Sequence, residues 1–96
     1  MLERDIEKAV CTYAKDRGFL VHKMQTGRGG TAGWPDRMFI RDGRVFFCEF
    51  KRTGGKLSEL QKRMIHILQQ HHISVYVIDN ITEGKNMIDG EVAVIA

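Results

Sequence analysis

The feature that most constrains the fold of this sequence is an Asp-Gly pair, Asp42-Gly43, between two apolar runs at residues 36–41 and 44–51. Asp-Gly in this setting is the strongest short-range signal for a two-residue hairpin turn. A turn of this length fixes the strand pairing, so that opposed positions have residue numbers that sum to 85. We therefore predict an antiparallel hairpin in which Asp36 lies opposite Glu49.

This register brings two carboxylates together on one face. Directly opposed residues in an antiparallel pair have Cβ atoms roughly 4.5–5.5 Å apart, and like charges there are destabilising. The same pairing sets Met38 against Phe47, so the rest of that face is apolar and should lie under a helix, where an unpaired carboxylate costs more. Lys51 follows Glu49 by two residues and returns to the same face. The pair of acids therefore needs a cation.

A hard cation such as Mg²⁺ takes oxygen ligands, which suits two carboxylates and a strand carbonyl such as that of Phe50. The metal would polarise a phosphoryl oxygen and activate a water, and Lys51 could orient that water or neutralise charge on the phosphorane. This arrangement predicts phosphodiester hydrolysis. The alternative is a longer hairpin loop, which would shift the register and leave Glu49 and Lys51 as a surface ion pair.

The remaining pattern predicts one small α/β domain over residues 1–96, since this length suffices for only one domain. Apolar spacing and turn signals predict the elements in this order: a helix over residues 2–16, strands over 19–24, 36–41 and 44–51, a helix that begins after Ser58, a central parallel strand over 73–79, a turn or short helix over 81–90, and a final strand over 91–95. The order αβββαββ implies a sandwich in which helices flank a mixed β-sheet.

The net charge of +3 hides an uneven distribution. Residues 15–63 contain twelve Lys and Arg against five Asp and Glu, whereas the two flanking segments are slightly acidic. If the middle segment folds onto one face, that face would suit a phosphate backbone. The alternative is solvated charge spread all round the molecule.

Cysteine usage and the N-terminal sequence bear on the location of the protein. Cys11 and Cys48 lie in apolar surroundings without metal-ligand spacing, so we expect reduced core residues. The charged start leads into no long apolar stretch, which predicts neither a signal peptide nor a membrane span. We expect a cytoplasmic protein.

Pro35-Asp36, followed after twelve residues by Glu49-Phe50-Lys51, resembles the PD-(D/E)xK nuclease superfamily with its restriction-endonuclease-like fold. The surroundings resemble its virus-type replication-repair nuclease (VRR-NUC) branch over roughly residues 2–79. The segments that carry the narrower resemblance are Glu3-Arg4-Asp5-Ile6, Gly33-Trp34-Pro35-Asp36-Arg37, Glu49-Phe50-Lys51-Arg52, Gly54-Gly55-Lys56-Leu57-Ser58 and Gln61.

The resemblance implies a DNA endonuclease that depends on Mg²⁺ or Mn²⁺, with Asp36 and Glu49 as metal ligands and Lys51 as the catalytic lysine. It adds a glutamate of the first helix as a further acid, and Gln61 as a supporting residue. Stand-alone members are similar to Holliday-junction resolvases that act as homodimers on branched DNA. Two other functions stay open: a DNA-binding module without catalysis, and a nickase or flap nuclease.

Two assignments within this site have competing interpretations. At 100° per residue, Glu3 lies about 65° from the centre of the helix's apolar stripe and Glu7 about 105°, so Glu3 reaches the sheet more easily and is a further candidate metal ligand. Glu7 would then be a solvated flank. Gln61 could serve the active site or could only complete a capping box with Ser58.

Basic residues near the acids are candidates for DNA contacts, since phosphate contacts dominate the positioning of nucleic-acid-binding proteins. They are Arg28, Arg37, Arg52, Lys56 and Lys62. Each of them could instead be an ordinary solvated side chain. Trp34 could stack on an unpaired base, or it could simply pack beside Pro35.

Overall fold

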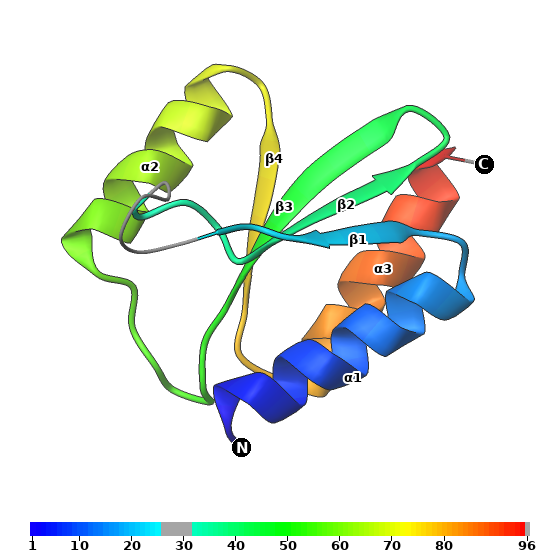
Figure 1. The fold of residues 1–96 in the computed structure, drawn as a ribbon, viewed down its shortest axis with the longest axis horizontal. Coiled ribbons are helices and arrows are strands. Elements are labelled where there is room, and N and C mark those ends of the chain that lie inside the picture. The colour runs from blue at the N-terminus through cyan, green and yellow to red at the C-terminus, as the bar shows by residue number, and fades with distance from the viewer. Residues whose placement is uncertain (26–31, 96) are drawn as a thin grey trace.

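The computed structural model describes residues 1–25 and 32–95 and has seven elements (Figure 1). They are α1 (Glu3–Asp16), β1 (Leu20–Lys23), β2 (Arg37–Arg41), β3 (Arg44–Phe50), α2 (Glu59–Gln70), β4 (Ser74–Ile78) and α3 (Ile81–Ile95). The result is an α/β sandwich with a four-stranded mixed sheet flanked by helices, as predicted.

The β2–β3 hairpin has the predicted register. Its paired residues run from Arg41 opposite Arg44 to Arg37 opposite Cys48, so that the residue numbers sum to 85 throughout. Asp42 and Gly43 have φ values of 48° and 81°, the left-handed conformation that a two-residue hairpin turn requires and that Asp and Gly tolerate. The longer loop with a shifted register is therefore excluded.

The sheet has the order β1-β2-β3-β4. The pairs β1–β2 and β2–β3 are antiparallel, and β4 runs parallel to β3 after the crossover through α2. The parallel pairing confirms the prediction for residues 73–79. The predicted central position of this strand is wrong, because β4 lies at an edge of the sheet that the described residues form.

The expected final strand over residues 91–95 is also wrong, because these residues form the last part of α3. The side chain of Asn80 accepts a hydrogen bond from the N–H of Glu83 at 2.8 Å, which satisfies one of the free donors at the start of this helix. Met87 and Ile88 are buried one turn further on. Residues 91–95 therefore belong to α3 and do not pair with β4.

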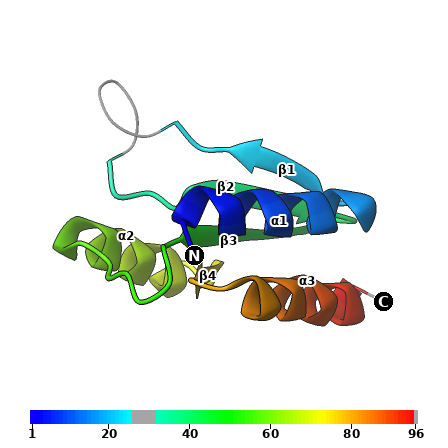
Figure 2. The same ribbon diagram turned by 90° about the horizontal axis from the view of Figure 1, so that it is seen from below.

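The main core lies between the sheet and the pair of helices α1 and α3, which run side by side (Figure 2). It includes Ile6, Val10, Cys11, Phe39, Phe46, Cys48, Phe50, Ile78, Met87 and Ile88. Both cysteines are buried free thiols, as expected. In the described residues, no helix combines the length and the apolar character needed to cross a membrane.

Helix α2 stands apart from α1 and α3 (Figures 1 and 2). Side chains alternate along β3, so Phe47 and Glu49 point away from the face that carries Phe46, Cys48 and Phe50. A hydrogen bond joins Glu49 to Gln61 near the start of α2. The acidic face of the hairpin therefore lies under a helix, and that helix is α2.

Candidate active site

Asp36 lies in the bend that leads into β2, and hydrogen bonds hold it from two directions. Its backbone carbonyl accepts from the N–H of Met24 at 2.8 Å, which ties the bend to the end of β1. Its side-chain Oδ2 accepts from the N–H of Phe50 at 2.8 Å, which ties it to the end of β3. The carboxylate is therefore fixed beside the segment that carries Glu49 and Lys51.

Glu49 is the more buried of the two acids, with 2% of its surface exposed. Its Oε1 accepts a hydrogen bond from Nε2 of Gln61 at 3.2 Å. Its Oε2 is buried and accepts no hydrogen bond from any residue that the structure describes. Burial, reinforced by the neighbouring carboxylate of Asp36, raises the pKa of Glu49 to about 8.

Lys51, which directly follows β3, and Glu3, the first residue of α1, lie near the same pair of acids. The backbone N–H of Lys51 donates to the carbonyl of Ile78 at 2.9 Å, which holds its chain against the end of β4. Burial raises the pKa of Glu3, the carboxylate of Asp36 raises it further, and the Lys51 ammonium opposes both. The charges of Glu3, Asp36 and Lys51 therefore act on one another in this region.

A hollow of about 430 Å³ opens beside these charged groups. Its lining residues are Leu2, Glu3, Lys51, Arg52, Gly55 and Lys56. Three of these six carry positive charge and one carries negative charge. A hollow lined in this way suits a phosphate group better than an apolar ligand.

The structure separates the two glutamates of α1. Glu7 pairs with Arg37 in a half-buried ion pair and so faces the start of β2. Glu3 is exposed and lines the hollow that contains Lys51. Glu3 is thus closer to the candidate site than Glu7, as its angle on the helix predicted. Its role in catalysis or metal binding stays a prediction.

Gln61 both completes the capping box with Ser58 and contacts an acid of the candidate site, the two interpretations that the sequence left open. Its Oε1 accepts from the N–H of Ser58 at 2.9 Å, and its own N–H donates to Oγ of Ser58 at 3.2 Å, which is a complete capping box. The other end of the same amide donates to Glu49. An amide has separate donor and acceptor atoms, so the two interactions are compatible.

The carboxylates suit a divalent cation in number and in chemistry. Mg²⁺ is commonly held by one or two carboxylates and several waters. The buried Oε2 of Glu49, next to Asp36, is an acceptor in need of a positive partner. Among the described residues, no group of three or more His, Cys, Asp and Glu is placed to hold a metal, so Glu3 is not arranged here as a third ligand.

The basic residues expected to contact DNA lie in different surroundings. Arg52 and Lys56 line the hollow beside Lys51. Arg37 pairs with Glu7, and Lys62 pairs with exposed Glu59 at 3.2 Å. Arg28 falls outside the described residues.

Trp34 packs edge-on against the ring of Phe47, with centroids 6.1 Å apart. This contact matches the packing interpretation rather than base stacking. Gly33, just before it, approaches α2 so closely that an added Cβ would lie 2.9 Å from the carbonyl oxygen of Leu60. The chain that leads into Asp36 is therefore packed against α2.

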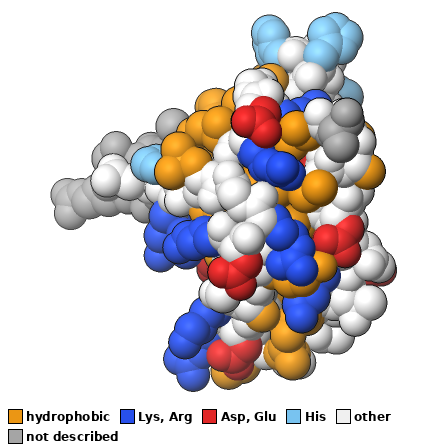
Figure 3. Space-filling view, turned by 90° about the vertical axis from the view of Figure 1, so that its right-hand side faces the viewer, with side chains coloured by type: hydrophobic (Ala, Val, Ile, Leu, Met, Phe, Trp, Pro, Cys, Tyr) orange, Lys and Arg blue, Asp and Glu red, His pale blue; other side chains and the backbone are white. Residues whose placement is uncertain are grey.

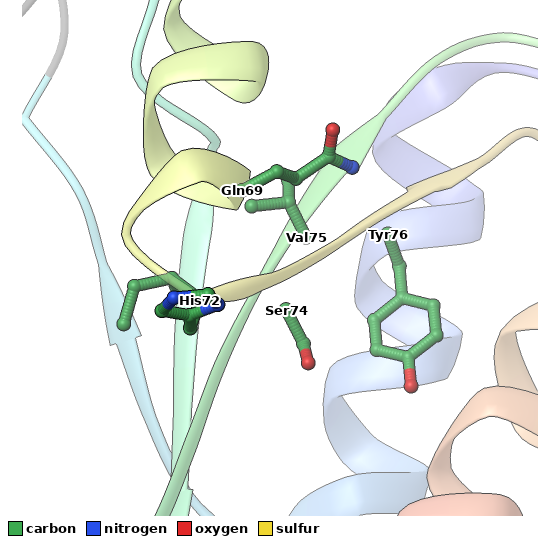
Figure 4. Close-up of a pocket in the computed structure, with 6 residues that line it drawn as sticks. Gln69, His72, Ser74, Val75 and Tyr76 are labelled. Carbon is green, nitrogen blue, oxygen red and sulfur yellow. The ribbon is translucent and has the colours of Figure 1, made fainter.

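A second hollow, of about 480 Å³, lies along the outer edge of β4 (Figure 4). Its lining residues are Gln69, His72, Ile73, Ser74, Val75 and Tyr76. It contains neither a carboxylate nor a lysine, so it lacks the groups that hydrolysis of a phosphodiester would need. We therefore place the candidate active site at Asp36, Glu49 and Lys51.

Comparison with known proteins identifies the fold and the family of this chain. A solved structure described as a VRR_NUC domain superimposes with a TM-score of 0.79 over 91% of this chain and 94% of that chain, at 22% sequence identity. No curated protein matches the sequence. The family model of the VRR-NUC domain matches residues 3–80, a span that includes Glu3, Asp36, Glu49, Lys51 and Gln61. The chain belongs to the VRR-NUC family.

Proposed function

We propose that this protein is a DNA endonuclease that depends on Mg²⁺ or Mn²⁺ and hydrolyses phosphodiester bonds in the cytoplasm. The family supplies the nuclease class. The observation that carries the metal-dependent mechanism is the pairing of buried Glu49 with half-buried Asp36 near Lys51, with one oxygen of Glu49 left without a hydrogen bond from the described residues.

The two carboxylates would hold the metal, and the backbone carbonyl of Phe50 is a third candidate ligand. When bound, the metal would polarise the scissile phosphate and lower the pKa of a water. The protein holds both acids in place beforehand, since Asp36 accepts from the N–H of Phe50 and Glu49 accepts from Gln61. Groups fixed in advance lose little free energy to reorganisation during the reaction.

Lys51 would act on the phosphate directly. Lys51 lines the hollow together with Arg52 and Lys56, and its charge acts on Glu3 and Glu49. A positive charge there would stabilise the negative charge that builds up on the phosphate oxygens. Arg52 and Lys56 would bind neighbouring phosphates, and Glu3 would orient a water or contribute an outer ligand.

We further propose that the substrate is branched DNA and that the active form is a homodimer. Resolution of a four-way junction requires two symmetric cuts, which a two-fold assembly provides. A domain of this size also buries a small core and gains from association. A nickase or flap nuclease would instead act as a monomer with one cut.

The test is a cleavage panel with labelled duplex, flap and four-way DNA in Mg²⁺, Mn²⁺ or EDTA. We expect cleavage only with a divalent cation, and a loss of at least about 100-fold for Asp36→Asn and for Lys51→Ala, since each removes a charge at the reacting centre. Asp16→Asn and Lys85→Ala change exposed residues outside the site and serve as matched controls.

Three results would overturn parts of this proposal. Metal-dependent cutting by both Asp36→Asn and Lys51→Ala at the wild-type rate would remove the assigned site. DNA binding without any divalent-dependent product would favour a non-catalytic binding module. Sedimentation that shows only monomer, together with single cuts in flap substrates, would replace the resolvase by a nickase or flap nuclease.

A further inference from the structure

A third hollow lies along α1 and shares no lining residue with the one that contains Lys51. It has a volume of about 450 Å³ and lies between α1, β1 and the start of β2. Five of its eight lining residues are cationic and one is anionic: Arg4, Lys8, Lys15, Lys23 and Arg37, with Glu7. We call it the α1 groove.

The negative charge in the α1 groove is neutralised within the groove itself, because Glu7 pairs with Arg37. The other four cations, Arg4, Lys8, Lys15 and Lys23, are exposed and form no ion pair with any residue that the structure describes. The groove therefore has a net charge of about +4. Unpaired cations around a concave surface focus the electrostatic field toward an anionic ligand.

The cations on α1 follow a line along the helix. At 100° per residue, Arg4, Lys8 and Lys15 fall within about 40° of one another around the axis. From Arg4 to Lys15 the helix rises about 16 Å, which corresponds to about five base pairs of duplex DNA. An extended polyanion fits this line better than a compact anion does.

The α1 groove lies close to the candidate active site. Arg4 directly follows Glu3, and Arg37 directly follows Asp36 in the sequence. Cys11 lines the groove, and the charges of Arg37 and Asp36 both act on its pKa, which burial raises to about 11. The groove is therefore near Asp36 and extends along α1 as far as Lys15.

We propose that the α1 groove binds the DNA backbone beside the scissile phosphate, so that the strand continues from the hollow of Lys51 and Lys56 past the acids and along α1. This inference rests on the proposed endonuclease function and adds a binding path to it. The cations are exposed and flexible, which suits contacts that position a backbone without reading its sequence. On the face of the molecule drawn in Figure 3, Lys and Arg side chains lie among Asp and Glu side chains.

The test measures the salt dependence of binding to a labelled DNA duplex by fluorescence anisotropy in EDTA, where no cleavage occurs. The double variant Lys8→Gln/Lys15→Gln removes two groove cations. Its matched control, Arg17→Gln/Lys85→Gln, removes two exposed cations outside the groove. Circular dichroism checks that both variants fold.

Each phosphate contact contributes a slope of about −0.9 to the plot of log K against log salt concentration. We therefore expect the slope to become shallower by about 2 for Lys8→Gln/Lys15→Gln and to change by less than about 0.5 for the control. A wild-type slope in the groove variant, or an equal change in the control, would overturn the proposal. If the wild-type protein neither binds nor cuts DNA, the proposed function itself fails.

Discussion

Glu49 is the most deeply buried acid of the candidate active site. Its side chain is almost fully buried, one oxygen is held by Gln61, and the other has no hydrogen-bond donor among the described residues. A buried group that lacks a partner in the folded chain costs free energy, and natural proteins retain such groups where a function uses them. The free energy of unfolding should therefore depend on whether Glu49 is protonated.

The first prediction concerns pH. The pKa of Glu49 rises from 4.5 to about 8 on folding, so the native state keeps a proton that the unfolded chain releases above about pH 4.5. The native state then binds more protons than the unfolded state in this interval, and stability falls as the pH rises from about 4.5 to 8. Glu49→Gln has no proton to release and should not show this fall.

Thermal unfolding in EDTA between pH 5 and pH 9 measures the effect. We expect the free energy of unfolding of Glu49→Gln, relative to that of the wild type, to be higher at pH 9 than at pH 5 by at least about 1 kcal/mol. For a domain of this size this corresponds to roughly 4–8 °C in Tm. Exposed Glu83→Gln is the control. Mg²⁺ at pH 8 should raise the Tm of the wild type and leave Glu49→Gln nearly unchanged. Parallel Tm curves for both proteins would contradict the prediction.

The sequence predicted much of this site because local rules determine it. A two-residue turn fixes the register, and the register places Glu49 and Lys51 beside Asp36. The double role of Gln61 was not predictable, since the capping box is a local pattern while the contact with Glu49 depends on how α2 docks on the sheet. The partner of Glu7 depends in the same way on how α1 packs against β2.

At the scale of the elements, α3 is where sequence reasoning failed. Its last residues, Glu91 to Ile95, are rich in β-branched side chains and follow Gly90, a composition typical of a strand after a turn. The buried positions Gly84, Met87, Ile88 and Glu91 nevertheless recur at helical spacing. Tertiary packing against α1 outweighs local propensity here.

Gly84 lies where α3 packs closely against α1. A Cβ at this position would lie 2.3 Å from Cγ2 of Val10, which is well inside van der Waals contact. We predict that Gly84→Ala lowers the free energy of unfolding by about 1–3 kcal/mol, because the helices must separate or side chains must leave their rotamers. Denaturant unfolding with a constant m-value would measure it.

Gly90 provides the matched control, since it lies in the same helix and a Cβ there would meet nothing within 4 Å. Gly90→Ala should stabilise the protein by about 0.4–1 kcal/mol through the lower entropy of the unfolded chain. Adding Val10→Ala to Gly84→Ala should recover part of the loss, with a coupling of at least about 0.5 kcal/mol. Equal stabilities of Gly84→Ala and Gly90→Ala would contradict the close contact.

At the scale of the whole molecule, one ionic cluster joins three elements. Glu91 on α3 is 2% exposed and accepts from Nε of Arg44 at 2.7 Å and from the hydroxyl of Tyr76 at 3.2 Å. Arg44 opens β3, and Tyr76 lies on β4. The family model ends at residue 80, so α3 with Glu91 lies beyond the matched region, whereas Arg44 and Tyr76 lie within it. Helix α3 nevertheless supplies part of the core.

We predict that Arg44→Met destabilises the protein by about 3–5 kcal/mol, because it leaves the buried carboxylate of Glu91 without its cation. The double variant Arg44→Met/Glu91→Met removes both charges and should recover most of this loss. Lys62→Met breaks an exposed ion pair with Glu59 and should change stability by less than about 1 kcal/mol. If chemical denaturation shows an equally large loss of stability for Arg44→Met and Lys62→Met, the buried ion pair of Arg44 and Glu91 is not the cause.

The turn at Asp42-Gly43 lies at the far end of the hairpin from the acids, roughly 20 Å away at 3.3 Å per strand residue. The length of this turn fixes the register of the two strands, and the register decides which side chains lie opposite one another. One extra residue in the turn would slip β3 against β2 and could turn Glu49 and Lys51 to the opposite face. The family's variation in length should therefore be confined to other loops, and this short turn should resist insertion as strongly as the site resists substitution.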